Sequence, residues 1–282
     1  MSTKKRVLVV GAGSYIGESF TKYAQCRFDI TTVGTQVGEW KTFDFTGYNS
    51  ILHVAGIAHV KTTKDNEQFY YQINRDLAVE TAKKAKAQGV KHFVFLSSLY
   101  IYIERLKTNL WIDPNTPPTP GTIYGKSKWE AEQELQKLAD TDFKICSVRP
   151  PMVYGKDCKG NFPQLIKFAK LFPVFPNDPN KRSMIYIDNL CEHLCQLIEN
   201  ETQGATLPHN IEYVNTTELV KAIRTAYGKR TFTTRLFNPI IRLLAGRVSV
   251  FNKLFGDLCY ERQGDEAAYN VQTFHESITR SV

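Results

Sequence analysis

Short apolar runs alternate with longer amphipathic segments along the first half of the chain. The runs are rich in β-branched and aromatic residues, which is typical of buried strands, and the segments between them have the apolar spacing of helices. Strands that alternate with helices up to about residue 150 predict an α/β fold with a doubly wound parallel sheet. The expected strands are Arg6 to Val10, Ile30 to Val33, Ile51 to Ala55, His92 to Leu96 and Lys144 to Val148.

The expected helices follow from apolar spacing and from capping signals. Gly89 is a C-cap signal after a long helical pattern, and a proline-rich loop precedes a later one. The expected helices are a first one through Ser19, Phe20 and Tyr23, then Glu67 to Gln88, Ser127 to Ala139, Asp188 to Asn200 and Thr217 to Tyr227.

The first expected strand runs directly into Gly11-Ala-Gly-Ser-Tyr-Ile-Gly17, and a helix follows. Gly11 permits a tight turn, and Gly17 lets the helix pack closely on the strand. The N-terminus of that helix is then directed at the pyrophosphate of a dinucleotide. Ile16 stands where the third glycine of the common G-x-G-x-x-G motif would lie. This context predicts a nicotinamide-dinucleotide site with contacts from Gly11, Ser14, Tyr15, Ile16 and Gly17.

The groups that distinguish NAD from NADP are missing from their usual places. An NAD site usually has an acidic residue about 20 residues after the glycine loop, at the end of the second strand. Gly34 occupies that position, Asp29 is at the wrong end of the strand, and no arginine nearby marks NADP. NAD and NADP both remain open as cofactors. Asp44-Phe45 follows in a turn, and both residues are expected to contact the cofactor; Asp44 fits either an adenine contact or an ordinary turn.

Small residues end two more of the expected strands. Ala55 and Gly56 follow the third strand, where they leave room for a ligand to cross the edge of the sheet. Ser97 and Ser98 follow the fourth strand. Because the carboxyl ends of parallel strands meet at one edge, we expect these residues next to the glycine loop.

Tyr124-Gly-Lys-Ser-Lys128 opens a helical run. Tyr124 and Lys128 are four residues apart, so they share one face of a helix. A phenol with an ordinary pKa of about 10 is a poor proton donor and acceptor at neutral pH. A cation about 4 Å away is worth roughly 4 kcal/mol at an effective dielectric of about 20, which lowers the pKa of the phenol by about three units. The pair fits either a surface contact or a tuned acid–base group.

After Pro151 the alternation gives way to loop signals built on Gly, Pro and Asn. We therefore expect a dinucleotide-binding domain over 1–150 and a smaller, loop-rich substrate region over 151–282 that is partly interwoven with it. Ile211 to Asn215 is expected as a short strand before a helix capped by one of the two following threonines. The apolar stretch Phe237 to Leu244 fits core, a subunit contact or a membrane-surface patch, in that order.

Composition and charge limit the class of function. The chain has 282 residues and a formal net charge of +8. This charge fits a nucleic acid or an anionic small molecule, but the lysines are spread along helices and no nucleic-acid motif is present, which favours a phosphorylated ligand. No apolar run approaches the roughly 18 residues that span a membrane, so no membrane span is expected.

The cysteines indicate neither disulfides nor a metal site. The six of them, at 26, 146, 158, 191, 195 and 259, lack the spacing of disulfide frameworks or zinc sites. Cys191 and Cys195, with His193 between them, are interpreted as a half-buried helix face, and no metal is expected. Free thiols without a signal peptide indicate the cytoplasm.

Together these motifs resemble the extended short-chain dehydrogenase/reductases, specifically their nucleotide-sugar epimerase/dehydratase branch. The resemblance covers nearly the whole chain, is strongest through residue 190 and is thin after residue 230. The family's G-x-x-G-x-x-G loop matches Gly11, Ser14 and Gly17, with serine in place of the middle glycine. Its catalytic Ser/Thr and its Tyr-x-x-x-Lys match Ser98, Tyr124 and Lys128.

The resemblance implies roles for these residues. Tyr124 would take or give the proton of a sugar hydroxyl, Lys128 would hold the nicotinamide ribose and lower the pKa of Tyr124, and Ser98 would hydrogen-bond the same sugar oxygen. Arg182 would face the diphosphate of a nucleoside-diphosphate sugar, and Asn161 would lie near its nucleotide.

The resemblance also implies an arrangement of helices. Asn74 matches a helix asparagine of the family. The helix that carries Asn74 and the helix begun by Tyr124 are expected on one face of the sheet, where related enzymes pair them with a partner's helices. A homodimer is therefore expected.

Three functions fit this sequence. The first is a nucleoside-diphosphate-sugar epimerase that acts at C4 through a transient 4-keto intermediate, for precursors of cell-surface polysaccharides. The second is an NAD(P)H-dependent reductase of 4-keto-sugar nucleotides. The third is a non-catalytic nucleotide-sensing protein, which the intact set of Ser98, Tyr124 and Lys128 argues against. Dehydration is disfavoured because Leu99 and Tyr100 occupy the places of the Asp-Glu pair of the family's dehydratases.

Overall fold

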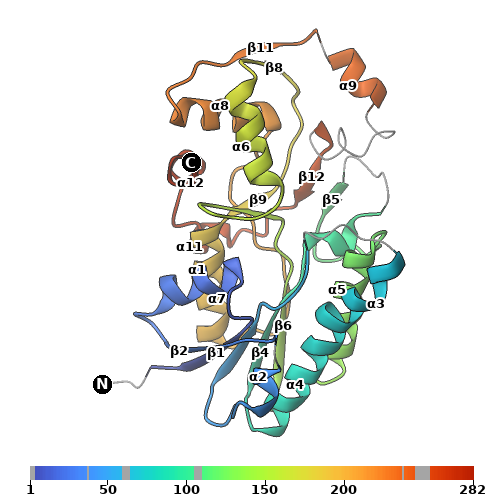
Figure 1. Ribbon diagram of the computed structural model, residues 1–282, viewed down its shortest axis with the longest axis vertical. Coiled ribbons are helices and arrows are strands. Elements are labelled where there is room, and N and C mark those ends of the chain that lie inside the picture. The colour runs from blue at the N-terminus through green and yellow to red at the C-terminus, as the bar shows by residue number, and fades with distance from the viewer. Residues whose placement is uncertain (1–3, 37, 59–63, 105–109, 237, 245–254) are drawn as a thin grey trace.

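A parallel sheet forms the centre of the N-terminal lobe (Figure 1). The computed structural model describes residues 4–36, 38–58, 64–104, 110–236, 238–244 and 255–282. Within these residues six strands lie in the order β10-β6-β4-β3-β1-β2, and every pairing is parallel. They are β1 (Arg6–Val10), β2 (Asp29–Val33), β3 (Ser50–His53), β4 (His92–Leu96), β6 (Lys144–Val148) and β10 (Gly204–Thr206).

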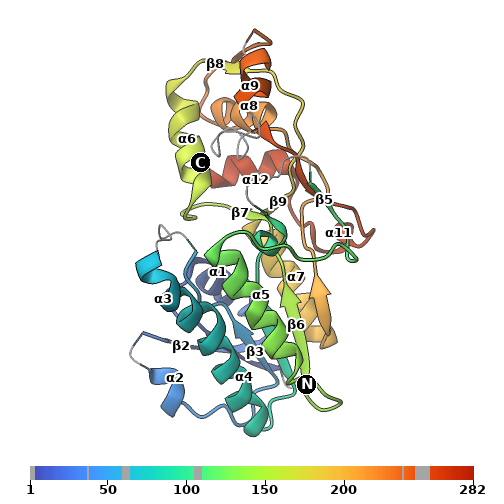
Figure 2. The same cartoon turned by 90° about the vertical axis from the view of Figure 1, so that its right-hand side faces the viewer.

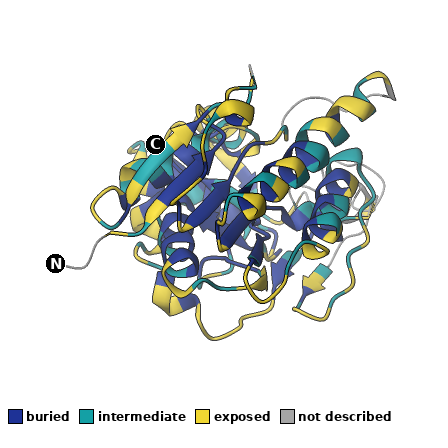
Figure 3. Cartoon of the chain, turned by 90° about the horizontal axis from the view of Figure 1, so that it is seen from below, coloured by how far each residue is buried: buried dark blue, intermediate teal, exposed yellow. Residues whose placement is uncertain are grey.

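The side chains of the strands alternate between two hydrophobic clusters, one on each face of the sheet. Val7 and Val9 point into the cluster that packs against α1 and α7, whereas Leu8 and Val10 point into the cluster beneath α4 and α5. Figure 3 shows the strands as a buried, dark-blue layer between helices that expose their outer sides. The predicted doubly wound sheet is confirmed. The covering helices are α1 (Tyr15–Ala24), α7 (Ile187–Asn200), α4 (Leu77–Ala87) and α5 (Ile123–Gln136).

The helix that carries Asn74 and the helix that carries Tyr124 lie on the same face of the sheet, as expected (Figure 2). The first is not continuous, because a π-helical turn separates its two halves and contains Asn74. Such turns are rare and occur often at functional sites. The segments in this order are η1 (Lys64–Asn66), α3 (Glu67–Tyr71), η2 (Gln72–Asp76) and then α4.

The C-terminal lobe consists of short strand pairs and helices above the carboxyl edge of the sheet (Figure 1). Its pairs are β7 (Met152–Tyr154) with β9 (Met184–Tyr186), β8 (Val174–Pro176) with β11 (Phe232–Thr234), and β5 (Leu110–Ile112) with β12 (Leu258–Tyr260). Its helices are α6 (Asn161–Leu171), α8 (Thr216–Ala226), α9 (Asn238–Leu244), α11 (Glu266–Tyr269) and α12 (Phe274–Ser281).

The two lobes exchange segments across residue 150. Both α7 and β10 come from the second half of the chain, yet they cover and extend the N-terminal sheet. In the other direction β5, from the first half, pairs with β12. The division of the chain into two domains at residue 150 remains a prediction. These exchanged segments are where the two regions are interwoven.

Two local predictions in the second half are wrong. The segment Ile211 to Asn215 is no strand, because only Val214 forms a bridge, and its partner is Arg182. The following helix is capped by Asn215 and not by a threonine, since Asn215 Oδ1 accepts from the amide of Glu218 at 2.6 Å. Of the apolar stretch 237–244, residue 237 lies outside the described residues and the rest forms α9.

Candidate active site

The turn between β1 and α1 allows close approach of the backbone. Gly11 has a φ of 124°, and a Cβ there would lie 2.7 Å from the amide nitrogen of Ala55. Ser14, which replaces the family's middle glycine, caps α1 because its Oγ accepts from the amide of Gly17 at 3.2 Å. A Cβ on Gly17 would lie 2.6 Å from that Oγ. The first-turn amides of α1, which lack intrahelical acceptors, suit an anion.

Tyr15 and Ile16 anchor this loop with inward-facing side chains. The Tyr15 hydroxyl is buried and has no hydrogen-bond partner among the described residues, and burial raises its pKa. It lies against Gly155, whose Cβ would be 2.5 Å from the hydroxyl. Ile16 packs against the cluster on the α1 face of the sheet. From both residues we therefore expect backbone contacts to a ligand.

An acidic side chain lies at the carboxyl end of β2, although the residue that carries it is not at the position where NAD sites usually have one. A Cβ built on Gly34 would lie 2.9 Å from Oε2 of Glu39, the first residue of α2 (Glu39–Thr42). The Glu39 carboxylate thus stands where the side chain of an acidic residue at position 34 would be. The sequence pattern missed it because the chain turns back between the two residues.

Asp44 and Phe45 have different environments. Asp44 is exposed, and its Oδ1 accepts from the amide of Thr46 at 2.9 Å in a turn. The hydrogen bond from the Thr46 hydroxyl is the main reason that the pKa of Asp44 lies below its usual value. Phe45 is fully buried beneath α4. The adenine contact predicted for Asp44 remains a proposal, and the side chain of Phe45 is core.

Asn74 fastens the loop after β3 to α5. Its side chain is fully buried; Nδ2 donates to the Ile57 carbonyl and to Ser127 Oγ, both at 3.1 Å, and Oδ1 accepts from the Ile57 amide at 2.9 Å. A Cβ on Gly56 would lie 3.0 Å from Asn74 Oδ1 and 3.1 Å from Lys128 Nζ. The loop therefore passes so close to these two side chains that a Cβ at position 56 would require them to shift.

Ser98 and Tyr124 meet at the carboxyl edge of the sheet. Ser98 follows β4 and caps η3 (Leu99–Tyr102) by accepting from the Tyr100 amide at 3.2 Å. Tyr124 is in the first turn of α5, and its ring packs edge-on against Tyr100 with 5.7 Å between ring centres. Burial raises the pKa of Tyr124 to about 12, and a hydrogen bond from Ser98 acts in the opposite direction.

Lys128 lies one helical turn after Tyr124 and is buried. Its ammonium group donates to the carbonyl of Leu96 at 2.9 Å and lies 4.6 Å from the centre of the Phe95 ring. Burial lowers the pKa of Lys128 to about 7, and the Glu132 carboxylate acts in the opposite direction. The expected lowering of the Tyr124 pKa by Lys128 is not seen in this structure, where burial dominates the pKa of both groups.

A buried ion pair beneath the site ties α5 to the sheet. Arg149, which follows β6, donates to Oε2 of Glu132 on α5 through Nη2 at 2.6 Å and Nε at 3.0 Å. Ser97 donates to the same carboxylate, and Arg149 Nη1 donates to the Tyr102 hydroxyl at 2.5 Å. Sequence reasoning missed this network. Its only local signal is that Glu132 follows Lys128 at helical spacing.

Arg182 offers a cation next to this cluster. Its guanidinium is close enough to Tyr100 for an electrostatic interaction, and Nη1 donates to the Gly256 carbonyl at 2.9 Å. Burial lowers its pKa, and no carboxylate of the described residues forms an ion pair with it. A buried guanidinium that forms no ion pair with a described carboxylate suits a phosphorylated ligand. Asn161 is exposed at the first residue of α6.

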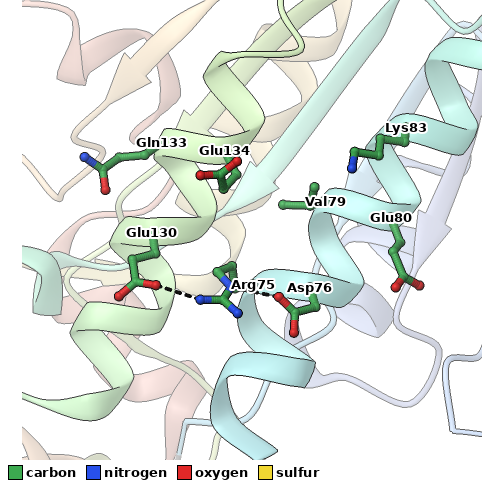
Figure 4. A pocket seen from close by; sticks show the side chains of 8 residues that line it. All are labelled: Arg75, Asp76, Val79, Glu80, Lys83, Glu130, Gln133 and Glu134. Carbon is green, nitrogen blue, oxygen red and sulfur yellow. Dashed lines mark hydrogen bonds and ion pairs between the residues drawn. The ribbon is translucent and has the colours of Figure 1, made fainter. Parts of the chain in front are cut away.

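A separate hollow of about 350 Å³ lies outside the site, between η2–α4 and α5 (Figure 4). Its lining is charged, and Arg75 spans it to reach Glu130 at 2.8 Å while also contacting Asp76 at 2.7 Å. No candidate site residue lines it. It marks the helix face on which a dimer contact is expected. The other lining residues are Val79, Glu80, Lys83, Gln133 and Glu134.

The described residues contain no group of three His, Cys, Asp or Glu side chains placed to hold a metal ion. Cys191, Cys195 and His193 are buried in α7, whereas a half-buried helix face was expected. The reason is that α7 packs against the sheet and against α1 and α11. Among the described helices, none is both long and apolar enough to cross a membrane.

The site joins a glycine loop, a Ser–Tyr contact and a buried lysine at one edge of the sheet. A model of the NAD dependent epimerase/dehydratase family matches residues 7–211. The chain belongs to this family. Membership in this NAD-dependent family gives the enzyme a nicotinamide cofactor, NAD or NADP.

Two relatives that align with most of the chain are named as 4-epimerases. A UDP-glucose 4-epimerase from Vibrio cholerae is 31% identical over 278 residues, which is 89% of this chain and 83% of that protein. An N-acetyl-alpha-D-glucosaminyl-diphospho-ditrans,octacis-undecaprenol 4-epimerase from Escherichia coli O157:H7 is 24% identical over 272 residues, 89% of this chain and 81% of that protein.

Solved structures share the fold at lower identity. A UDP-glucuronic acid 4-epimerase from Bacillus cereus in complex with NAD has a TM-score of 0.75 and 15% identity, covering 98% of this chain and 97% of that one. A dTDP-4-dehydrorhamnose reductase from Bacillus anthracis in complex with NADP has a TM-score of 0.72 and 20% identity, covering 99% and 98%. The likeness over both lobes confirms the Rossmann-type fold of the whole chain.

Proposed function

We propose that this enzyme interconverts the C4 epimers of a sugar carried on a diphosphate, with a nucleoside-diphosphate sugar as substrate and a transient 4-keto sugar as intermediate. The observation that carries the proposal is the contact between Ser98 and Tyr124, with Lys128 one helical turn behind, at the edge where the glycine loop lies. The 4-epimerase names of two relatives that align over most of the chain support it.

The proposed roles follow from the positions of three side chains. Tyr124 accepts the proton of the sugar O4 during oxidation and returns it during reduction. Ser98, whose hydroxyl lies beside that of Tyr124, turns its one proton from the phenol to the same sugar oxygen when the substrate binds. Lys128 releases the Leu96 carbonyl and turns its ammonium group toward the cofactor ribose and the phenol, which brings the pKa of Tyr124 down. When bound, the nicotinamide supplies the hydride acceptor and donor.

The cradle fits a nicotinamide dinucleotide. Gly11 lies where a Cβ would collide with the backbone of Ala55, and Gly56 where a Cβ would crowd Asn74 and Lys128, so the backbone stays open to a ligand there. We propose NAD over NADP because the Glu39 carboxylate lies at the end of β2. A carboxylate at this place accepts the 2′-hydroxyl of the adenosine ribose and repels a 2′-phosphate.

The diphosphate is assigned to Arg182. Its guanidinium is without a carboxylate partner among the described residues and lies near Tyr100, next to the acid–base pair. Asn161 is proposed near the nucleotide from its place at the start of α6. The two relatives are named for different carriers, a nucleotide and a polyprenyl diphosphate. Both carriers present the sugar on a diphosphate, so Arg182 serves either.

A reductase of 4-keto sugars is the second candidate. The observation that favours it is the similarity of both lobes to a dTDP-4-dehydrorhamnose reductase. Both reactions use the same acid–base pair and differ in whether the reduced cofactor leaves. The position of Glu39 and the names of the two relatives support the epimerase over the reductase.

The deciding experiment follows sugar and cofactor together. With an NDP-hexose and catalytic NAD, the epimerase should produce the C4 epimer with no net change in the absorbance of reduced nicotinamide. A reductase would instead consume one reduced cofactor for each 4-keto sugar. Steady consumption of reduced cofactor without interconversion of C4 epimers would reject the proposal in favour of the reductase.

A further inference from the structure

The end of α6, the β8–β11 pair and the turn after β11 form the tip of the C-terminal lobe, farthest from the central sheet (Figures 1 and 2). Leu171 is 74% exposed, Phe232 65% and Leu236 82%. These side chains belong to the end of α6, to the β8–β11 pair and to the turn that follows it. We call this set the distal patch: Phe168, Leu171, Phe172, Val174, Phe232 and Leu236.

Four members of the patch are joined in two pairs. The rings of Phe168 and Phe172 are 4.4 Å apart at their centres. Val174 and Phe232 are partners in the register of the β8–β11 pair, so their side chains lie on one face of it. The amide of Phe232 donates to the carbonyl of Pro173 at 2.8 Å, which holds this pair beside the end of α6.

The patch rests on a firm base. Arg224 is buried beneath it and donates through Nη1 to the carbonyls of Ala169 at 2.6 Å and Phe172 at 3.2 Å. Its Nε and Nη2 donate to the Arg230 carbonyl at 3.0 and 2.6 Å. One side chain thus caps α6 and fixes the strand entry, so the exposed apolar groups belong to an ordered surface.

The surroundings of the patch are basic. Exposed cations flank the apolar groups, and none of them forms an ion pair with a carboxylate of the described residues. The two segments that build this part of the lobe, 158–177 and 219–256, contain eleven Lys and Arg and no Asp or Glu, so they supply no carboxylate to pair with these cations. Their charge of +11 exceeds the net charge of +8 of the whole chain. The flanking cations are Lys167, Lys170, Lys229, Arg230 and Arg235.

Exposed Leu and Phe surrounded by unpaired Lys and Arg match the chemistry of an anionic lipid surface. Apolar side chains enter the boundary between headgroups and acyl chains, while the cations remain among the lipid phosphates. We propose that the distal patch docks this enzyme on the surface of an anionic membrane, without spanning it. This inference goes beyond the proposed function and does not depend on it, although docking would place the site above a membrane-held sugar diphosphate.

The test is vesicle binding with matched variants. Wild-type protein should co-sediment with vesicles of phosphatidylcholine and phosphatidylglycerol, weakly with phosphatidylcholine alone, and less as salt is added. Lys170→Gln/Lys229→Gln/Arg235→Gln should lower the partition coefficient about a hundredfold, at roughly fivefold for each cation. Leu171→Gln/Phe232→Gln/Leu236→Gln should lower it at least about tenfold. The control Lys22→Gln/Lys83→Gln/Lys91→Gln removes as much charge elsewhere and should bind nearly as wild type.

The proposal would be overturned by no binding of wild-type protein to anionic vesicles, by equal loss in the control variant, or by unchanged binding of the apolar variant. If the patch instead joins two copies of the chain, the apolar variant will lower the mass seen by light scattering without lipid, which also overturns it. Circular dichroism checks that each variant is folded. The patch variants should keep wild-type turnover on a soluble substrate, so failure of docking and failure of the epimerase proposal give different results.

Discussion

The ammonium group of Lys128 donates a hydrogen bond to the carbonyl of Leu96 at 2.9 Å. The lysine is thereby held against the end of β4, over the Phe95 ring, in a buried place that lowers its pKa to about 7. The lysine expected to tune Tyr124 is thus held by the backbone in this structure. Its pKa also makes the stability of the fold depend on pH.

Lys128→Met should stabilise the fold more at low pH than at high pH. The folded pKa of about 7 is below the ordinary value of 10.5, so unfolding takes up a proton between these values. The buried charge therefore costs stability fully below about pH 7, and this cost disappears as the pH rises toward about 10.5. Urea unfolding at about pH 6 and about pH 10 measures the difference. The exposed Lys126→Met serves as control, and an equal gain for Lys128→Met at both pH values would contradict the prediction.

Tyr124→Phe should abolish most turnover without loss of cofactor binding. The substitution keeps the ring that packs against Tyr100 and removes only the hydroxyl. A lost general acid–base lowers turnover about 10²–10⁴-fold. Single-turnover kinetics and calorimetric titration with NAD measure the two effects, and Tyr100→Phe is the matched control. Undiminished activity of Tyr124→Phe would reject both the epimerase and the reductase.

Glu39→Gln should weaken NAD binding about tenfold, because the charge-assisted hydrogen bond to the ribose becomes a weaker, neutral one. NADP binding should stay the same or improve, since a negative charge near the 2′-phosphate is removed. Fluorescence titration with both reduced cofactors gives the ratio. Glu80→Gln, exposed on α4, should leave this ratio unchanged. A parallel loss for both cofactors would show that Glu39 only supports the end of β2.

Arg182→Ala should weaken binding of the sugar diphosphate roughly ten- to a hundredfold, the effect of a charge-assisted contact. NAD affinity should not change. Isothermal titration with a nucleoside-diphosphate sugar and with NAD separates the two, and the exposed Arg262→Ala is the control. Equal losses for both ligands would assign Arg182 to structure, through its contact with Gly256.

The protein should be a homodimer through the outer face of α3–α5. Phe69, on α3, is 51% exposed. Phe69→Glu should therefore convert the dimer to a monomer in light scattering at micromolar concentration, while Phe232→Glu at the distal patch should not. A wild-type monomer under these conditions would end the idea.

The sequence was sufficient where a function depends on local spacing. The loop Gly11 to Gly17 and the pair of Tyr124 with Lys128 lie within single strand–turn–helix or helix segments, so their patterns are visible in one dimension. The helices that the sequence predicted lie within a few residues of their expected bounds for the same reason, whereas α6 and α12 were not predicted. Strand β10 was missed because Gly204-Ala-Thr206 is too short to show any alternation.

The remaining parts of the site arise from packing between distant segments. Glu132 and Arg149 become partners only when α5 lies across β4 and β6. Glu39 approaches Gly34 because the chain folds back into α2. Phe45 seemed available to a ligand, but the side chains of α4 close over it. The spacing of residues within one segment cannot predict such contacts between distant segments.

The placement of β10 at the edge of the sheet has a consequence for synthesis. A nascent chain that ends at residue 150 would leave β6 as an unpaired edge and one face of the sheet without α7. The ribosome must release residues beyond Thr206 before the nucleotide lobe is closed. The N-terminal lobe therefore cannot be excised or grafted as an independent domain. The nascent enzyme stays exposed to aggregation and to chaperones until both lobes have emerged from the ribosome.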